Sequence, residues 1–167
     1  MDPQDSLIAA IEFSIGLAGF SGLIFAFRSR SSVASELFRY RAINLVALAL
    51  GAGSVSFTAV LCSHIFDEPT NWKVSSCVAL GSIVVVTAYN QRQKSELMKE
   101  MAELGGYRLL RIGYLISGLT VFGLQILSLM GFLGGYEFAV LYSVIAFFIF
   151  WGSAQFVRTL FAVGDDI

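Results

Sequence analysis

Five stretches of the chain are nearly unbroken runs of apolar residues, and short polar segments separate them. The runs cover residues 7–27, 42–66, 74–89, 112–133 and 138–161. A helix needs about 20 mostly apolar residues to cross the roughly 30 Å hydrocarbon core of a bilayer. The pattern therefore predicts an all-α integral membrane bundle of about five transmembrane helices, forming a single domain over residues 1–167. The third run is the shortest, so its assignment depends on the charge pattern.

Lysine and arginine are unevenly distributed between these runs. With five spans, every basic residue except Lys73 falls on one side of the membrane, mainly in segments 28–41 and 92–111. Basic residues stay on the cytoplasmic side during insertion. The chain is therefore expected to have its N-terminus outside and its C-terminus in the cytoplasm. Without the third span, the two basic segments would lie on opposite sides, so the charges support that span.

The polar segments predict how the spans are connected. Asp2 and Asp5 occupy the place where a cleavable signal peptide would be basic, so the first span is expected to be a retained anchor. Residues 67–71 and 134–137 predict short external turns. A helical pattern at about 92–104 predicts an interfacial or cytoplasmic connecting helix between the third and fourth spans, with docking of a partner protein as the lesser alternative.

Composition excludes several classes of protein. Hydrophobic residues make up 56% of the 167 residues and charged residues only 14%, whereas soluble domains carry roughly 45–50% and about 25%. The expected surroundings are a lipid bilayer. A formal net charge of -1 gives no reason to expect a nucleic-acid partner.

Small and polar residues recur at helical spacing within four of the spans. The stripes are Ala9, Glu12, Gly16, Gly19, Gly22 and Ala26; Asn44, Ala47, Gly51, Ser54, Thr58 and Cys62; Tyr114, Ser117, Gly118, Val121, Gln125 and Ser128; and Tyr142, Ala146, Ile149 and Ser153. Small residues let membrane helices approach closely, while polar groups facing lipid would be unsatisfied. The stripes are therefore expected to face inward, as helix–helix interfaces or as the lining of a water-filled path. The aromatic residues of the last span, 147, 148, 150 and 151, are expected to face outward.

Ten residues of these stripes are candidates for a pore or for helix packing. They are Glu12, Gly16, Gly19, Asn44, Gly51, Ser54, Thr58, Ser117, Gln125 and Ser128. Glu12 is the acidic residue that lies clearly inside a span, and ionisable groups there often mark ion or proton paths. Alternatively, its side chain could reach the external interface.

Other reactive residues point to no catalytic chemistry. Cys62 and Cys77 are expected at similar depth on the external side, where they could form a disulfide or pack as two unpaired thiols. One histidine and two cysteines are too few for a usual zinc site, so no metal is expected. No phosphate-binding loop, nucleophile elbow or paired carboxylates occur, so neither an enzyme nor a cofactor is expected.

Three segments carry a resemblance to known proteins. Gly19–Arg28 reads GFSGLIFAFR, Glu36–Arg41 reads ELFRYR, and Ala154–Arg158 reads AQFVR. Together they resemble small multi-pass inner-membrane proteins of bacteria. The resemblance covers both ends of the chain and implies a bacterial inner-membrane location, but no particular activity.

Two functions are compatible with these patterns. In the first, the protein is a homo-oligomeric channel or pore subunit for ion transport, in which one polar-striped helix per chain lines the conduit. In the second, it is a non-conducting accessory or scaffolding subunit that binds another membrane protein. The glycine-rich first span and the repeated stripes favour symmetric packing, and therefore the channel.

Overall fold

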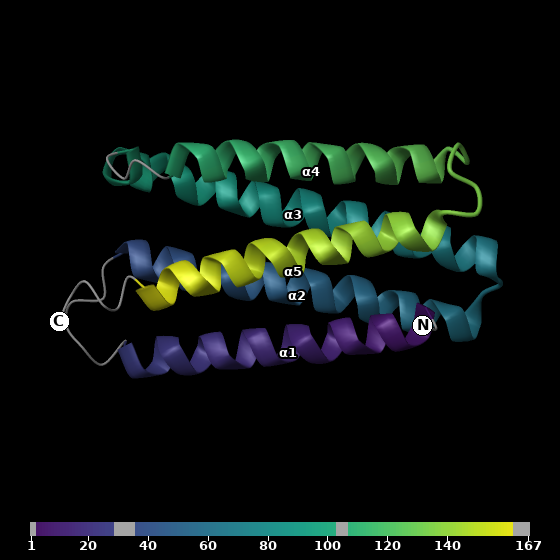
Figure 1. Ribbon diagram of the computed structural model, residues 1–167, viewed down its shortest axis with the longest axis horizontal. Coiled ribbons are helices and arrows are strands. Elements are labelled where there is room, and N and C mark those ends of the chain that lie inside the picture. The colour runs from purple at the N-terminus through teal and green to yellow at the C-terminus, as the bar shows by residue number, and fades with distance from the viewer. Residues whose placement is uncertain (1–2, 29–35, 103–106, 162–167) are drawn as a thin grey trace.

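The structure is a computed structural model that describes residues 3–28, 36–102 and 107–161. The described residues form five α-helices. Their bounds are α1 (Pro3–Arg28), α2 (Glu36–Ile65), α3 (Glu68–Ala102), α4 (Tyr107–Leu129) and α5 (Glu137–Phe161). Successive helices run in opposite directions along one bundle (Figure 1). All five contain an apolar segment long enough to cross a membrane. The expected all-α bundle is therefore confirmed, and the chain has the features of a multi-pass membrane protein.

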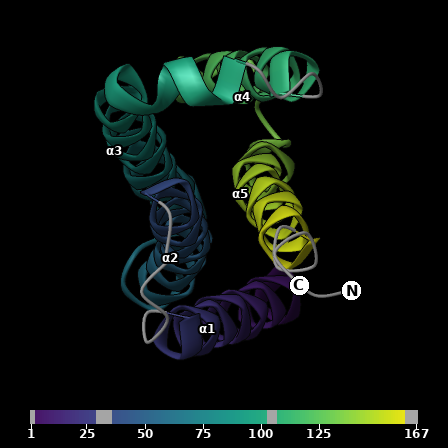
Figure 2. The ribbon, with the colours of Figure 1, turned by 90° about the vertical axis from the view of Figure 1, so that its left-hand side faces the viewer.

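The helices are arranged around α2 and α5. Helix α2 contacts α1, α3 and α5, whereas α4 contacts α3 and α5 among the described helices. Seen from one end, α1 and α4 lie on opposite sides of the α2–α5 pair (Figure 2). Consecutive helices all contact one another, and the additional contact between α2 and α5 closes the core.

The third span and the predicted connecting helix are one element. Helix α3 continues without interruption from Glu68 to Ala102, a run of 35 residues. At 1.5 Å per residue it is about 52 Å long, well beyond the roughly 30 Å of a hydrocarbon core. Since neither glycine nor proline stands between Tyr89 and Arg92, nothing in the backbone stops the helix where the apolar run ends. Residues 103–106 lie outside the described residues.

The turn after α4 shows why the fourth helix ends earlier than residue 133. The amide of Gly131 donates to the carbonyl of Ser128, and the amide of Phe132 donates to the carbonyl of Leu127, both at 3.0 Å. This is the Schellman pattern of helix termination. Gly131 has φ +81°, a left-handed conformation that glycine adopts without steric cost.

Aromatic residues of α5 fill the centre of the bundle. Phe147, Phe148 and Trp151 are buried, and Phe148 is 0% exposed. A Cβ atom at Gly51 of α2 would lie 3.3 Å from Cζ of Phe148, and one at Gly118 of α4 would lie 3.5 Å from the ring of Phe147. The expectation that these three aromatic residues face outward is therefore wrong. Glycines on α2 and α4 leave the space that the rings occupy.

The stripe of α5 that was expected to face inward also lies mainly on the outer side of the helix. Tyr142 and Ala146 are exposed, while Leu141, Val144 and Ile145 are fully buried. Large apolar side chains therefore line the inner face of α5, and the small residues stand mainly outside. Phe150 is exposed, as expected.

Candidate functional site on the open face of α1

Helix α1 packs on its neighbours through a stripe of buried residues. Leu7, Ala10, Ser14, Leu17 and Ser21 are buried and follow one another at alternating intervals of three and four. This spacing puts all five on one side of a helix. A Cβ atom at Gly53 of α2 would lie 3.3 Å from Cβ of Ser14, so the two helices approach closely there.

The hydroxyl groups in this stripe are satisfied within α1. The Ser14 hydroxyl donates to the carbonyl of Ala10 at 2.7 Å, and the Ser21 hydroxyl donates to the carbonyl of Leu17. Both bonds follow the i to i−4 pattern that serine commonly makes in helices. The serines therefore act as small packing residues and bring no unpaired polar group to the contact with α2.

The stripe predicted to face inward lies on the opposite side of α1. Glu12, Gly16 and Gly19 are exposed, as is Gly22. No described atom outside the local helix lies within 4 Å of a Cβ atom placed at any of these three glycines. The prediction that this stripe faces the inside of the bundle is therefore wrong for α1 within a single chain. We call Glu12, Gly16 and Gly19 the open face of α1.

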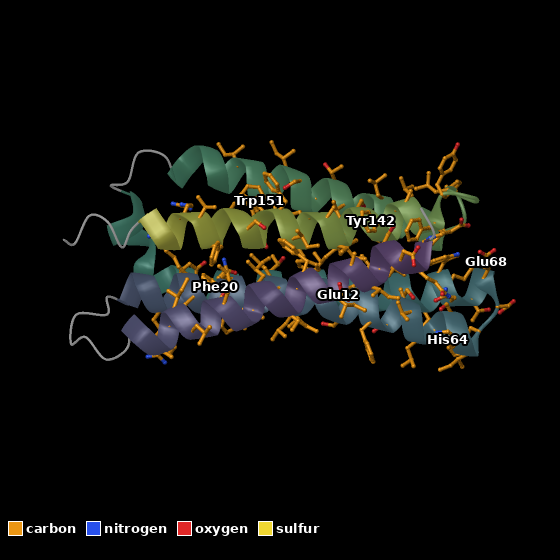
Figure 3. All side chains as sticks on the ribbon, turned by 60° about the horizontal axis from the view of Figure 1, so that its bottom comes forward. Glu12, Phe20, His64, Glu68, Tyr142 and Trp151 are labelled. Carbon is orange, nitrogen blue, oxygen red and sulfur yellow. The ribbon has the colours of Figure 1, made fainter. Side chains whose placement is uncertain are left out.

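Glu12 lies well inside the helix rather than at its end (Figure 3). It follows Pro3, the first residue of α1, by nine positions, which places it about 13 Å along the helix axis. The apolar segment of α1 runs from Pro3 to Ala26 and so includes it. A carboxylate at this depth is costly if it faces hydrocarbon.

The predicted residues of α2 occupy two different sides of that helix. Asn44 and Gly51 are buried, and Gly51 meets Phe148 of α5. The Oδ1 atom of Asn44 is buried without a hydrogen-bond partner in the described part of the chain. Ser54 is exposed beside a hollow of about 320 Å³ between α1 and α2, and Thr58 is half-buried.

The predicted residues of α4 face α5 and bind it by hydrogen bonds. Nε2 of Gln125 donates to the carbonyl of Val140 at 2.9 Å, while its Oε1 has no partner among the described residues. Nε1 of Trp151 donates to the Ser117 hydroxyl at 3.0 Å, and that hydroxyl donates to the carbonyl of Gly113 at 2.7 Å. Ser128 is also buried.

The ten candidates therefore do not form one site within a single chain. Those of α4 lie at the contact with α5, Gly51 of α2 meets α5 while Ser54 lines an outer hollow, and those of α1 point away from the bundle. The stripe of α1 that faces inward was not among the predicted ones. Its signal was present, since residues 7, 10, 14, 17 and 21 have the three-and-four spacing of helix packing.

The remaining reactive groups form no cluster among the described residues. Cys62 is buried and Cys77 is exposed, and both are free thiols, so the disulfide that the sequence allowed is not formed. His64 is exposed at the same end of the bundle as Glu68 (Figure 3). No group of three or more His, Cys, Asp or Glu residues that could hold a metal ion occurs within the described ranges.

Comparison with family models, curated proteins and solved structures gives no match to this chain. The resemblance to bacterial inner-membrane proteins therefore stays a prediction.

Proposed function

We propose that this protein is a subunit of a homo-oligomeric ion channel in a bacterial inner membrane, in which subunits meet near the open face of α1. The supporting observation is that no described atom outside the local helix lies within 4 Å of a Cβ atom placed at Gly16 or Gly19, although both lie in the middle of an apolar helix. Small residues are characteristic of surfaces where membrane helices touch through their backbones. A second copy of the chain would supply the missing contact.

Glu12 gives this face its proposed function. A carboxylate in the apolar segment needs water or polar groups nearby. If α1 of each subunit lies close to a symmetry axis, the Glu12 side chains form a ring on that axis. Rings of carboxylates attract cations in channels. The conduit is therefore proposed to be cation-selective and to lie between subunits, because the buried polar groups of α4 are used in helix–helix contacts.

The proposed orientation has the N-terminus outside and the C-terminus in the cytoplasm. Helix α1 ends at Arg28, α2 carries Arg39 and Arg41 near its start, and α5 carries Arg158 near its end. These positions share one end of the antiparallel bundle, whereas Glu68 and Glu137 begin α3 and α5 at the other end. Retention of basic residues inside supports a cytoplasmic location for the first end.

Reversal potential under a salt gradient tests the proposed conduit. A tenfold gradient is worth about 1.4 kcal/mol per monovalent ion, which corresponds to about 60 mV for a perfectly selective pore. The native protein in planar bilayers should give a cation-selective potential. Glu12→Gln removes the charge and keeps the shape, so the potential should move towards zero while the particle mass stays the same.

Glu68→Gln is the matched control, because Glu68 is exposed at the end of the bundle and lies on α3 rather than α1. Its reversal potential should remain close to that of the native protein. Equal selectivity in the native protein and Glu12→Gln would contradict a carboxylate ring. An oligomer without conductance would favour the alternative, a non-conducting accessory or scaffolding subunit that uses the same face to bind another membrane protein.

A further inference from the structure

Two arginines from different helices lie near each other at one end of the bundle. Helices α2 and α5 are antiparallel neighbours, so the start of α2 and the end of α5 share that end (Figure 1). Arg41 follows the first residue of α2 by five positions, and Arg158 precedes the last residue of α5 by three. The charge of Arg158 acts on the Arg41 guanidinium. We call Arg41 and Arg158 the arginine pair.

The packing of α2 against α5 places the arginine pair at one level along the bundle. A Cβ atom at Gly152 of α5 would lie 3.7 Å from Cβ of Leu48 of α2. Arg41 precedes Leu48 by seven residues, or about 10 Å, and Arg158 follows Gly152 by six, or about 9 Å. Seven residues are about two turns, so Arg41 lies on the side of α2 that faces α5.

Both guanidinium groups of the arginine pair are half-buried, whereas the neighbouring Arg39 is exposed. Bringing two like charges together while removing them partly from water is costly unless an anion lies close to them. Among the described charged groups, the one that acts on Arg41 is Arg158, which has the same sign. Arg158 has a further interaction within the chain. Arg41 is therefore the cation that lacks a counter-charge in the described part of the chain.

A buried carboxamide lies one turn from Arg41. Asn44 follows Arg41 by three residues and so lies on the same side of α2. It is 5% exposed, and its Oδ1 atom has no hydrogen-bond partner among the described residues. A buried polar group without a partner is costly. Turning the carboxamide over exchanges its oxygen and nitrogen, so Asn44 can offer Nδ2 as a neutral donor beside the Arg41 guanidinium.

The arginine pair lies at the boundary of the apolar part of the bundle. Arg41 is the third residue of the apolar segment Arg39–Ile65, and Arg158 is the last residue of the apolar segment Glu137–Arg158. Such segments correspond to the hydrocarbon core, and the polar headgroups begin where they end. Phosphate carries several acceptor oxygens and is bound well by guanidinium groups. The level and the donors of this cluster therefore fit the phosphate of a phospholipid.

We infer that Arg41, Arg158 and Asn44 bind a phosphate anion between α2 and α5, at the boundary between headgroups and hydrocarbon. Basic pockets between membrane helices are typical sites for anionic headgroups. A phosphate ion in solution offers the same chemistry, but the level of the arginine pair favours a headgroup. The site does not depend on the proposed channel, because Glu12 and the open face belong to α1. A protein that conducts nothing could still bind the anion, so the two proposals fail in different measurements.

Native mass spectrometry of the full chain in detergent tests the phosphate site. The first probe is an equimolar mixture of phosphatidylglycerol and phosphatidylcholine with identical acyl chains, and the second is inorganic phosphate. The native protein should retain phosphatidylglycerol in preference to phosphatidylcholine. Arg41→Gln should lower the affinity for phosphatidylglycerol about tenfold, or about 1.4 kcal/mol, which is the low end for a hydrogen bond to a charged group. Binding of inorganic phosphate that is lost in Arg41→Gln, without a preference between the lipids, would support the same site with a source in solution.

Arg39→Gln is the matched control, because it removes the same charge two residues away on the same helix. Two residues correspond to about 200° of rotation, so Arg39 lies on the opposite side of α2 from Arg41. Its affinity for phosphatidylglycerol should remain close to that of the native protein. Equal losses in Arg39→Gln and Arg41→Gln would overturn the site, because they would show a general effect of charge. Arg41→Lys keeps the charge without the planar donor group, so its affinity should lie between those of Arg41→Gln and the native protein.

Asn44→Leu separates binding from packing, because it removes the carboxamide and leaves the charge unchanged. It should lower the affinity for phosphatidylglycerol about fivefold, or about 1 kcal/mol, the typical net contribution of a neutral hydrogen bond. Without lipid its thermal stability should be unchanged or higher, since a buried oxygen without a partner is gone. Unchanged affinity in Asn44→Leu would overturn the role of Asn44 as a donor.

Two results would overturn the inference as a whole. One is that the native protein retains neither probe in preference to phosphatidylcholine. The other is that Asp165→Asn/Asp166→Asn, which removes two carboxylates near the end of the chain, raises the affinity for phosphatidylglycerol more than about tenfold. The anion at the arginine pair would then be a carboxylate of the chain itself and not a phosphate.

Discussion

Substituting leucine at Gly51 and, separately, at Gly19 compares two glycines in apolar helices that differ in their surroundings. A Cβ atom at Gly51 would lie 3.3 Å from Cζ of Phe148 and 3.4 Å from two further ring atoms. Phe148 is 0% exposed, so its ring is enclosed within the bundle. At Gly19 no described atom outside the local helix lies within 4 Å of the added Cβ. The two variants should therefore destabilise different levels of structure.

The expected magnitudes follow from these contacts. Overpacking of a close-packed core costs about 1–3 kcal/mol, and leucine adds four heavy atoms at Gly51, so the upper end applies. Replacing a glycine inside a helix stabilises that helix by up to about 1 kcal/mol, because glycine has a low helix propensity. Gly51→Leu should therefore lower the free energy of unfolding by about 2 kcal/mol. Gly19→Leu should leave the single chain unchanged or slightly stabilised, but should weaken contact between subunits at the open face of α1.

Two measurements on the same samples separate these effects. Unfolding in detergent, followed by circular dichroism, reports the stability of the chain, and particle mass reports the oligomer. Gly51→Ala is a milder version for use if the leucine variant does not fold, and it should fall between the native protein and Gly51→Leu. Equal loss of stability in Gly19→Leu and Gly51→Leu would refute the assignment of Gly19 to an open face. Unchanged mass in Gly19→Leu would show that subunits do not meet there.

Three further predictions concern helix contacts and topology. Ser117→Ala leaves the indole N–H of Trp151 without its acceptor, so it should cost about 1–3 kcal/mol and shift tryptophan fluorescence, whereas an unchanged spectrum would contradict the bond. Gln125→Met removes the hydrogen bond from Nε2 to Val140 together with a buried oxygen that has no partner in the described chain, so the two effects should largely offset and unfolding in detergent should show a loss below about 1 kcal/mol; a larger loss would mean that the oxygen is satisfied. In intact cells, cysteine introduced at Glu137 should react with a membrane-impermeant label and cysteine at Ser95 should not; labelling of both would refute five spans.

Much of the fold was predictable from the order of residues along the chain. A membrane helix satisfies its own backbone hydrogen bonds, so about 20 apolar residues in a row predict a helix without reference to its neighbours. The run at residues 74–89 is the shortest, and the distribution of charge around it also predicts a span; it lies within α3. The turn at Gly131 is equally local, since it depends on the left-handed conformation of one glycine.

The lengths of the helices were less predictable, because hydropathy reports where lipid ends and not where a helix ends. Helix α3 continues to Ala102 beyond its apolar run, and α4 stops at Leu129 inside its apolar run. In each case backbone chemistry decided the boundary. No breaker follows Tyr89, whereas Gly131 closes a Schellman cap.

Only the tertiary structure decided which side of each helix faces inward. In water, apolar residues identify the buried side of a helix, but lipid is as apolar as a protein core, so this signal is weak in membrane helices. The stripe of α4 agreed with the prediction because Gln125 needs an internal hydrogen-bond partner. On α1 and α5 the small residues did not identify the inward side. A glycine can accommodate a neighbouring side chain, as Gly51 of α2 does for Phe148, or it can lie on an open surface, as Gly19 of α1 does. Shape complementarity between helices distinguishes these two roles, and it exists only once the helices have packed.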